Sequence, residues 1–261
     1  MVAEMSIWNR IYEDYLMPSR LLEYERLLKV SIDLGFKHQT LSEYFNLVQF
    51  GDKPDGYFIH RHDIDSDCRT ARKMWEIEQK LGVKTSFYFR LNTLDFGLMK
   101  EIHASGSEVG YHYEELAQYA KDHHIKSTKE IELQIGLIRE KFKFNFNRFQ
   151  DGCGFKIESV ASHGDFVNRK LGMPNHVLVD ETLLKTCGIR FECYDKRIIG
   201  SFDSIMSDTV YPFFYRPSNP FDELQKKHKT LYLLTHPRHW RSAPIANTRE
   251  NFIRVWEGLT Y

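Results

Sequence analysis

Residues 57–65 read Tyr57-Phe58-Ile59-His60-Arg61-His62-Asp63-Ile64-Asp65, and this stretch decides the fold prediction. Its first part, 57–62, is apolar and aromatic and predicts a buried strand. Side chains alternate between the two faces of a strand, so His60 and His62 should lie on the face opposite Asp63 and Asp65. Burying ionisable groups is costly unless they have partners or a task. The end of this strand is therefore the first candidate for a functional site.

Strand-like and helix-like segments alternate on both sides of this stretch. The expected helices are 18–35, 41–48, 67–81, 96–104, 127–142 and 248–256, and the further expected strands are 85–89, 108–112 and 230–234. Ser127 and Glu130 have the spacing of a capping box. Beyond Asn145 the pattern is weaker and indicates short strands and loops. The alternation predicts an α/β fold with a parallel sheet covered by helices, preceded by a helical extension over residues 1–54.

Composition narrows the class of protein. The 261 residues carry 36 Lys+Arg and 36 Asp+Glu, and a net charge of zero makes nucleic acid an unexpected partner. No apolar run reaches the roughly 20 residues that span a bilayer, and residues 1–15 lack the apolar stretch of a secretory signal. The four cysteines form no C-x-x-C pair, which indicates reduced thiols. We therefore expect a cytoplasmic protein without a transmembrane segment.

Three more polar motifs carry a histidine, two of them at the ends of expected strands. They are Gly110-Tyr111-His112-Tyr113-Glu114, Ser162-His163-Gly164-Asp165 and Leu234-Thr235-His236-Pro237. A single histidine at a strand end is more often a packed core residue than a ligand. Four polar strand ends in one α/β chain are harder to ascribe to chance, because such folds place active sites at the carboxyl ends of their strands.

The order of these motifs resembles the polysaccharide deacetylase family, over residues 55–241. It is especially similar to the branch associated with O-antigen and capsule synthesis, which reads His-Asp-x-Asp in its first motif. The resemblance implies a distorted (β/α) barrel over residues 55–261. It also implies that Asp63 is the general base, that Asp65 and His112 bind a divalent metal, and that His236 protonates the leaving amine.

The chain departs from the family pattern at several points. Leu116 stands where the family has a second metal-binding histidine, so we take His163 as the third ligand, with Glu114 as the next choice. The family's Arg-x-Pro-Tyr motif is not recognisable, and residues 206–208 match its later acidic motif only weakly. Arg90 and Glu114 are candidates for orienting the sugar. Trp240 is a candidate for stacking on it, or else a core residue.

The expected function is metal-dependent removal of an N-acetyl or N-formyl group from an amino sugar during the synthesis of a surface polysaccharide. Two imidazole nitrogens and a carboxylate favour zinc as the metal. Two alternatives remain open. His60 and His62 resemble the opening metal pair of binuclear amidohydrolase barrels, and a barrel without activity would bind a saccharide or a partner. The sequence leaves the acyl group, the sugar carrier, the metal and the oligomeric state undetermined.

Overall fold

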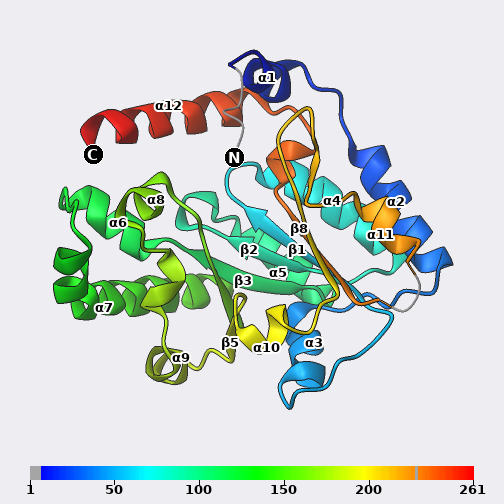
Figure 1. Ribbon diagram of the computed structural model, residues 1–261, viewed down its shortest axis with the longest axis horizontal. Helices are drawn as coiled ribbons and strands as arrows, with labels where there is room; N and C mark the ends of the chain where they lie inside the picture. Colours follow the sequence, from blue (N-terminus) through cyan, green and yellow to red (C-terminus); the bar gives the residue numbers. More distant parts are fainter. Residues whose placement is uncertain (1–6, 227–228) are drawn as a thin grey trace.

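A sheet of eight strands runs through the middle of the molecule (Figure 1). The computed structural model describes residues 7–226 and 229–261. Its strands are β1 (Phe58–Ile64), β2 (Ser86–Phe89), β3 (Glu108–Tyr113), β4 (Ser159–Ser162), β5 (Phe191–Glu192), β6 (Ser204–Asp208), β7 (Tyr215–Arg216) and β8 (Leu231–Thr235). Their order is β5-β4-β3-β2-β1-β8-β6-β7, and only the β6–β7 pair is antiparallel. The predicted α/β architecture of the distorted-barrel type is confirmed, with a sheet that does not close between β5 and β7.

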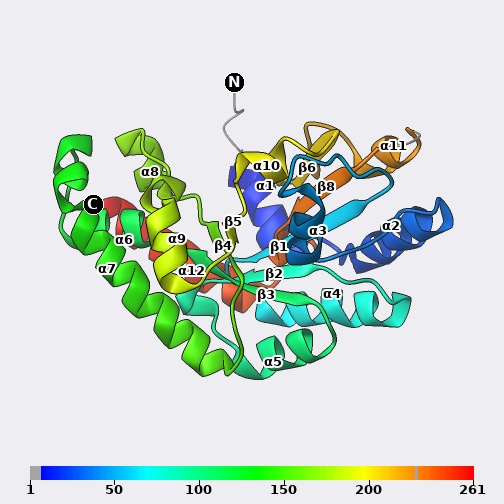
Figure 2. The same ribbon diagram turned by 90° about the horizontal axis from the view of Figure 1, so that it is seen from below.

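Helices surround this sheet (Figure 2). They are α1 (Ile7–Ile11), the π-helical turn η1 (Tyr12–Leu16), α2 (Leu21–Asp33), α3 (Leu41–Val48), α4 (Cys68–Leu81), α5 (Phe96–Ala104), α6 (Glu115–Asp122), α7 (Thr128–Cys153), α8 (Phe166–Leu171), α9 (Glu181–Cys187), α10 (Lys196–Ile199), α11 (Pro220–Leu224) and α12 (Pro244–Thr260). Short 3₁₀ turns lie at Leu91–Thr93, Asn175–Leu178 and Pro237–His239.

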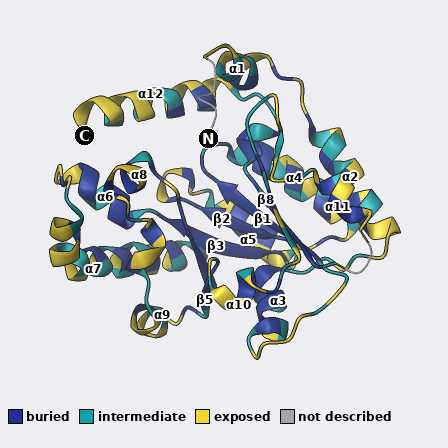
Figure 3. Cartoon of the chain, viewed as in Figure 1, coloured by how far each residue is buried: buried dark blue, intermediate teal, exposed yellow. Residues whose placement is uncertain are grey.

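The two faces of the sheet bury different sets of side chains. On the outer face, strands β2 and β3 pack against α5 and α7, while β1 and β8 pack against α2. On the inner face, α3 packs against side chains of β1, β2 and β8. Burying these apolar faces is the main stabilising contribution, and it fixes which side chains of each strand point inward. Strands β1 to β5 are buried throughout and β6 and β7 only in part, whereas α12 is largely exposed (Figure 3).

One glycine of β3 is required by close packing on the inner face. A Cβ atom added at Gly110 would lie 2.2 Å from the ring of Tyr88. That ring crosses over β3 so that the Tyr88 hydroxyl can hydrogen-bond Ser159 on β4, at 2.7 Å. A side chain at position 110 would therefore displace the ring and break this contact between β2 and β4.

Several helix and strand limits differ from the predictions. Strand β1 continues to Ile64, so Asp63 lies within the strand rather than after it. The predicted capping box at Ser127 does not form, whereas the Asp67 side chain does cap α4 by accepting from the Thr70 amide. The final helix begins at Pro244, four residues before the predicted start.

Helix α7 is the largest departure, because it runs to Cys153 instead of ending near residue 142. The prediction of short strands and loops after Asn145 was wrong for this segment. The buried positions Phe142, Phe146, Phe149 and Cys153 continue the helical spacing. Burial of this stripe outweighs the poor helix propensity of the Asn and Gly residues around it.

Candidate metal centre and acid–base pairs

The carboxyl ends of the central strands bring the predicted site residues together on the inner face of the sheet. In β1, Arg61 and Asp63 point inward while His60 and His62 point outward. The pairing of His62 with Thr235 places Asp63 and His236 side by side on adjacent parallel strands. The pairing of β3 with β4 brings His112 and His163 together in the same way. Strand register therefore gathers residues that are up to 173 positions apart.

Asp65, His112 and His163 form the best candidate metal site. Their potential ligand atoms lie within 4.8 Å of one another. The Oδ1 atom of Asp65 is 3.4 Å from His112 Nε2 and 3.7 Å from His163 Nε2. This oxygen is buried and accepts no hydrogen bond. An unpartnered buried carboxylate oxygen is costly, and a cation between the three side chains would remove that cost.

The tautomer of His112 supports the same interpretation. Its Nδ1 lies 3.0 Å from the carbonyl oxygen of Ala161, so Nδ1 carries the proton in the neutral ring. The lone pair on Nε2 then faces Asp65 and also Asp63, whose Oδ2 is 3.4 Å away. An imidazole that donates one ring N–H to a carbonyl and directs the other nitrogen to a cation is the usual arrangement of a metal-binding histidine. The three residues therefore fit a divalent metal.

Two other groups of the described residues have similar spacing, Asp208 with His236 and His239, and Glu114 with His163 and Asp165. In both groups the carboxylates already have other partners. Asp208 accepts from His236 and Trp240, Glu114 accepts from Arg90, and Asp165 accepts from Lys121. Among the carboxylates of the three groups, Asp65 is the one with an inward-facing oxygen that accepts no hydrogen bond.

Glu114 and Arg90 lie beside the candidate metal site. Arg90 donates two hydrogen bonds to the Glu114 carboxylate, at 3.1 and 2.6 Å. Glu114 Oε2 is in turn 3.2 Å from His163 Nδ1, which leaves His163 Nε2 toward Asp65. Burial would raise the pKa of Glu114, but His163 and Arg90 hold it well below its usual value. The carboxylate thus orients His163, and its role as a sugar ligand stays a prediction.

Arg61 holds Asp63, the predicted base, in a fixed orientation. Its Nε and Nη2 atoms donate to the two carboxylate oxygens of Asp63, both at 2.7 Å. The guanidinium is 1 % exposed and lies between the rings of Tyr88 and Tyr194, at 5.3 and 5.2 Å. No sequence motif marked Arg61, although its position two residues before Asp63 places it on the same strand face.

His236 is paired with Asp208 at the end of β6. Its Nδ1 lies 2.7 Å from Asp208 Oδ1, and its backbone N–H donates to Oδ2 at 2.6 Å. Burial by itself would lower the pKa of His236, but the Asp208 carboxylate raises it to about 9. The imidazole is therefore protonated at neutral pH, as a general acid requires. The weak match at residues 206–208 was the sequence signal for Asp208.

Trp240 belongs to the core, the second of its two interpretations. It is 0 % exposed, its ring packs edge-on against Tyr24, and its indole N–H donates to Asp208 at 2.9 Å. The ring has no exposed face on which a sugar could stack in this structure. Trp240 instead helps to fix the carboxylate that holds His236.

His60 and His62 do not form the metal pair of the amidohydrolase alternative. Both are 0 % exposed and lie on the outer face of β1, away from Asp65. His62 is enclosed by Glu78 and Thr235, at 2.8 and 2.5 Å. His60 lies among aromatic rings, and neither of its nitrogens has a hydrogen-bond partner. Strand alternation predicted that these histidines and the carboxylates lie on opposite faces, and the structure has them there.

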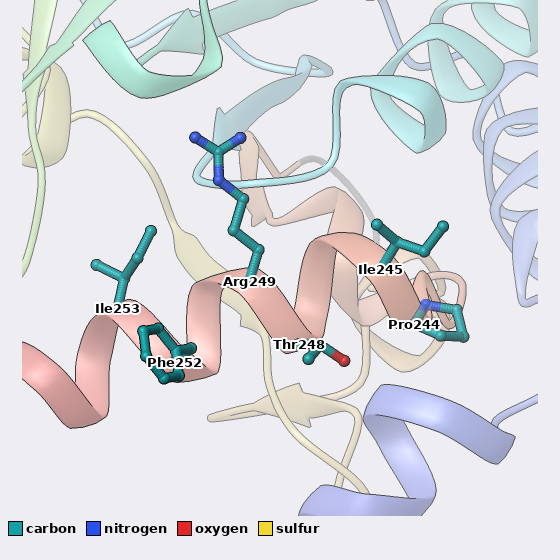
Figure 4. Close-up of a pocket in the computed structure, with 6 residues that line it drawn as sticks. All are labelled: Pro244, Ile245, Thr248, Arg249, Phe252 and Ile253. Atoms are coloured by element: carbon teal, nitrogen blue, oxygen red, sulfur yellow. The ribbon is translucent and has the colours of Figure 1, made fainter.

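A pocket of about 560 Å³ opens beside the candidate metal site. Asp65 and His163 lie in its wall together with Arg90 and Glu114, and residues of α12 form the opposite wall. A second hollow of about 610 Å³ lies on the outer side of α12 and is lined by residues of that helix alone (Figure 4). The first pocket is the one with access to the ionisable groups and the size of a ligand site.

No described helix is both long and apolar enough to cross a membrane.

Comparison with known proteins gives matches only among solved structures. No family model and no curated protein matches the chain. IcaB from Ammonifex degensii matches over 67% of this chain and 77% of its own, with 16% identity and a TM-score of 0.47. The Streptococcus pyogenes deacetylase PplD in complex with acetate matches over 84% of both chains, with 11% identity and a TM-score of 0.44.

A CE4 family pseudoenzyme from Bacillus anthracis also matches, over 80% of this chain and 63% of that one, with 12% identity and a TM-score of 0.42. TM-scores below 0.5 do not establish a shared activity, and an enzyme and a pseudoenzyme are both among the matches. The chemistry of this chain is therefore inferred from its own side chains.

Proposed function

We propose that this protein is a divalent-metal-dependent hydrolase that removes an N-acyl group from an amino sugar. The observation that carries the proposal is the inward oxygen of Asp65, buried without a hydrogen-bond partner and 3.4 and 3.7 Å from two imidazole nitrogens. Asp65, His112 and His163 would hold the metal. Two nitrogens and one oxygen suit zinc and leave positions for other ligands. Bound there, a metal supplies Lewis acidity toward the acyl oxygen and the attacking water.

Asp63 is the proposed general base. It lies next to the metal ligands, with Oδ2 3.4 Å from His112 Nε2, and can accept a proton from a water that attacks the acyl carbon. Arg61 occupies one lone pair of each carboxylate oxygen and prevents the side chain from rotating. A carboxylate oxygen has two lone pairs, so this ion pair still leaves an acceptor site on each oxygen for the proton.

His236 is the proposed general acid. An amide nitrogen is a poor leaving group until it is protonated, and His236 carries a proton at neutral pH because of Asp208. The strand register places it beside Asp63, so the base and the acid act from adjacent strands. Neither a covalent acyl-enzyme nor an organic cofactor is required for this reaction.

The proposed substrate is an N-acetyl or N-formyl amino sugar used in the synthesis of a surface polysaccharide. The resemblance of the motif order to polysaccharide deacetylases supports this choice, as does a pocket of about 560 Å³ lined by charged and polar groups. Arg90 and Glu114 lie in its wall and remain candidates for orienting the sugar.

The proposal is tested by metal analysis and product release. The purified protein, loaded with zinc, is offered N-acetyl and N-formyl amino sugars in free, nucleotide-linked and lipid-linked form, and released acetate or formate is measured. We expect release from at least one of them. Asp65→Ala and His112→Ala should lower the bound metal per chain, and an unchanged circular dichroism spectrum would show that each variant keeps the fold.

Glu101→Ala is a matched control, since Glu101 is an exposed carboxylate that pairs with Arg72 and does not line the pocket beside the candidate metal site. It should retain metal and activity. Full metal occupancy in the Asp65 and His112 variants would overturn the ligand assignment. Metal binding without any acyl release would favour a barrel that only binds a saccharide.

A further inference from the structure

The inner face of helix α12 is mostly polar and its outer face mostly apolar. Its inner face is attached through hydrogen bonds from Asn247 and Asn251 to Asp14, at 3.0 and 2.7 Å. Glu250, also on the inner face, pairs with Arg254 and lies 3.7 Å from Arg90. Five apolar side chains face outward, with the exposed fractions Ile245 84%, Phe252 71%, Val255 62%, Trp256 61% and Leu259 79%. A surface helix normally has the reverse arrangement.

The outward side chains have the spacing of a helix–helix interface. Ile245, Thr248, Phe252, Val255 and Leu259 follow one another at intervals of three and four residues. This heptad spacing produces a narrow apolar stripe that fits one partner helix. Figure 4 labels three of these residues, Ile245, Thr248 and Phe252, along the helix. We infer that the stripe binds the same stripe of a second copy of this chain, so that α12 forms the centre of a symmetric dimer.

The stripe is complementary to itself when two α12 helices run antiparallel about a twofold axis at Phe252. Positions equally far from residue 252 then face each other. Ile245 lies opposite Leu259, and the small Thr248 lies opposite the large Trp256. Arg249, a charged residue beside the stripe, lies opposite Val255 and next to Trp256, where a guanidinium can stack on the indole. Each contact occurs twice, as an isologous interface requires.

The available area is sufficient for a stable pair. The stripe continues onto η1, where Leu16 is 67% exposed and Tyr15 contacts α12 through a hydrogen bond between its hydroxyl and Thr248 at 2.9 Å. One aromatic side chain buries about 150–250 Å², and a standard interface buries about 800 Å² per partner. Phe252 and Trp256, with the aliphatic side chains of α12 and the two residues of η1, provide an area of this order.

A charged substitution in the stripe tests the inference without reference to any activity. We expect sedimentation velocity of the full chain at about 50 µM to show a dimer. Phe252→Asp should weaken dimerisation about 30-fold or more, as the loss of a central hot spot does. Leu133→Asp is the matched control, because Leu133, on α7, is also an exposed apolar side chain, at 82% against 71% for Phe252. A monomeric parent chain, or a dimer unaffected by Phe252→Asp, would overturn the inference.

A second measurement addresses geometry and does not depend on a destabilising charge. Phe252→Cys places the new thiol on the twofold axis, so mild oxidation should yield a covalent dimer on a non-reducing gel. Leu133→Cys controls for Cys68 and Cys187, which are partly exposed. Equal yields from both variants would rule out the antiparallel pairing. A monomeric chain that sediments with phosphatidylcholine–phosphatidylglycerol vesicles through the same stripe would assign it to a membrane surface instead.

Discussion

Both faces of strand β1 carry buried ionisable side chains, but the faces differ in how completely those side chains are hydrogen-bonded. On the outer face, both ring nitrogens of His62 have partners, and Glu78 accepts hydrogen bonds from His62, Tyr24 and Thr85. At the inner end, Asp65 has a buried oxygen that accepts none. Adjacent residues of β1 point to opposite faces of the sheet. Residue type alone therefore does not reveal which ionisable group stabilises the fold and which one faces the pocket.

Whether a buried ionisable group has all its hydrogen-bond partners is more informative about its role than its residue type. A buried ionisable group with a complete set of partners stabilises one conformation, whereas one with a free atom at a pocket can bind something. His60 is the exception on the outer face, since neither nitrogen has a partner. Burial keeps its pKa well below the usual value, so it remains neutral among the aromatic rings.

The largest expected effect comes from the inner face. Asp63→Asn should reduce the rate of acyl release about 10²–10⁴-fold, the usual contribution of a positioned general base. Metal content should be unchanged. The substitution also leaves Arg61 buried without its anion, which costs about 3–5 kcal/mol of stability, so kcat is measured at a temperature where circular dichroism shows the variant folded. A variant as fast as the parent would remove Asp63 from the mechanism.

A substitution on the outer face should lower stability and leave activity unchanged. Glu78→Gln keeps the shape of the side chain but removes the charge from its hydrogen bonds with His62, Tyr24 and Thr85. We expect the free energy of unfolding in urea to fall by about 1.5–3 kcal/mol, the range for hydrogen bonds to charged groups. Metal content and kcat should stay within twofold of the parent. A tenfold loss of activity in the folded variant would mean that the two faces are not separate in function.

The smallest effect is a shift in pH dependence. Asp208 raises the pKa of His236 to about 9, so this pair stabilises the fold fully below about pH 6.5, and the contribution is lost as the pH rises through about 9. Asp208→Asn should lower the pKa of His236 toward 6.5 and move the alkaline limb of the rate profile to lower pH. The pKa is measured by NMR titration of the imidazole in the metal-free protein. An unmoved limb, with an unchanged His236 pKa, would contradict the pairing.

The sequence was sufficient to predict the central sheet, because period-two alternation and apolar runs identify strands such as β1 and β8 directly. It was also sufficient to predict that Asp63, Asp65, His112, His163 and His236 converge, since parallel strands present their carboxyl ends at one edge. It did not reveal that α7 continues past residue 142. There the local propensity for helix is low, and tertiary burial of Phe146 and Phe149 determines the structure.

The partners of the site residues were harder to predict. Asp208 acts through contacts with His236 and Trp240 that join residues 28 and 32 positions apart, and no local pattern encodes such a pairing. The orientation of Trp240 also depends on contacts with residues distant in the sequence. Its burial depends on Tyr24 in α2, a helix from the opposite end of the chain.

The strand order has a consequence for the way this chain is made. β8 follows the other described strands in the chain, yet it lies between β1 and β6 in the sheet and pairs with β1 along five residues. Until the ribosome has released it, β1 has an uncovered edge and His236 is absent from the site. Such distant pairing slows folding, because a long loop must close before any contact is gained. The free edge of β1 must therefore stay unpaired until residues 231–235 have emerged, and a chaperone or a slow docking step is expected at that stage of its biogenesis.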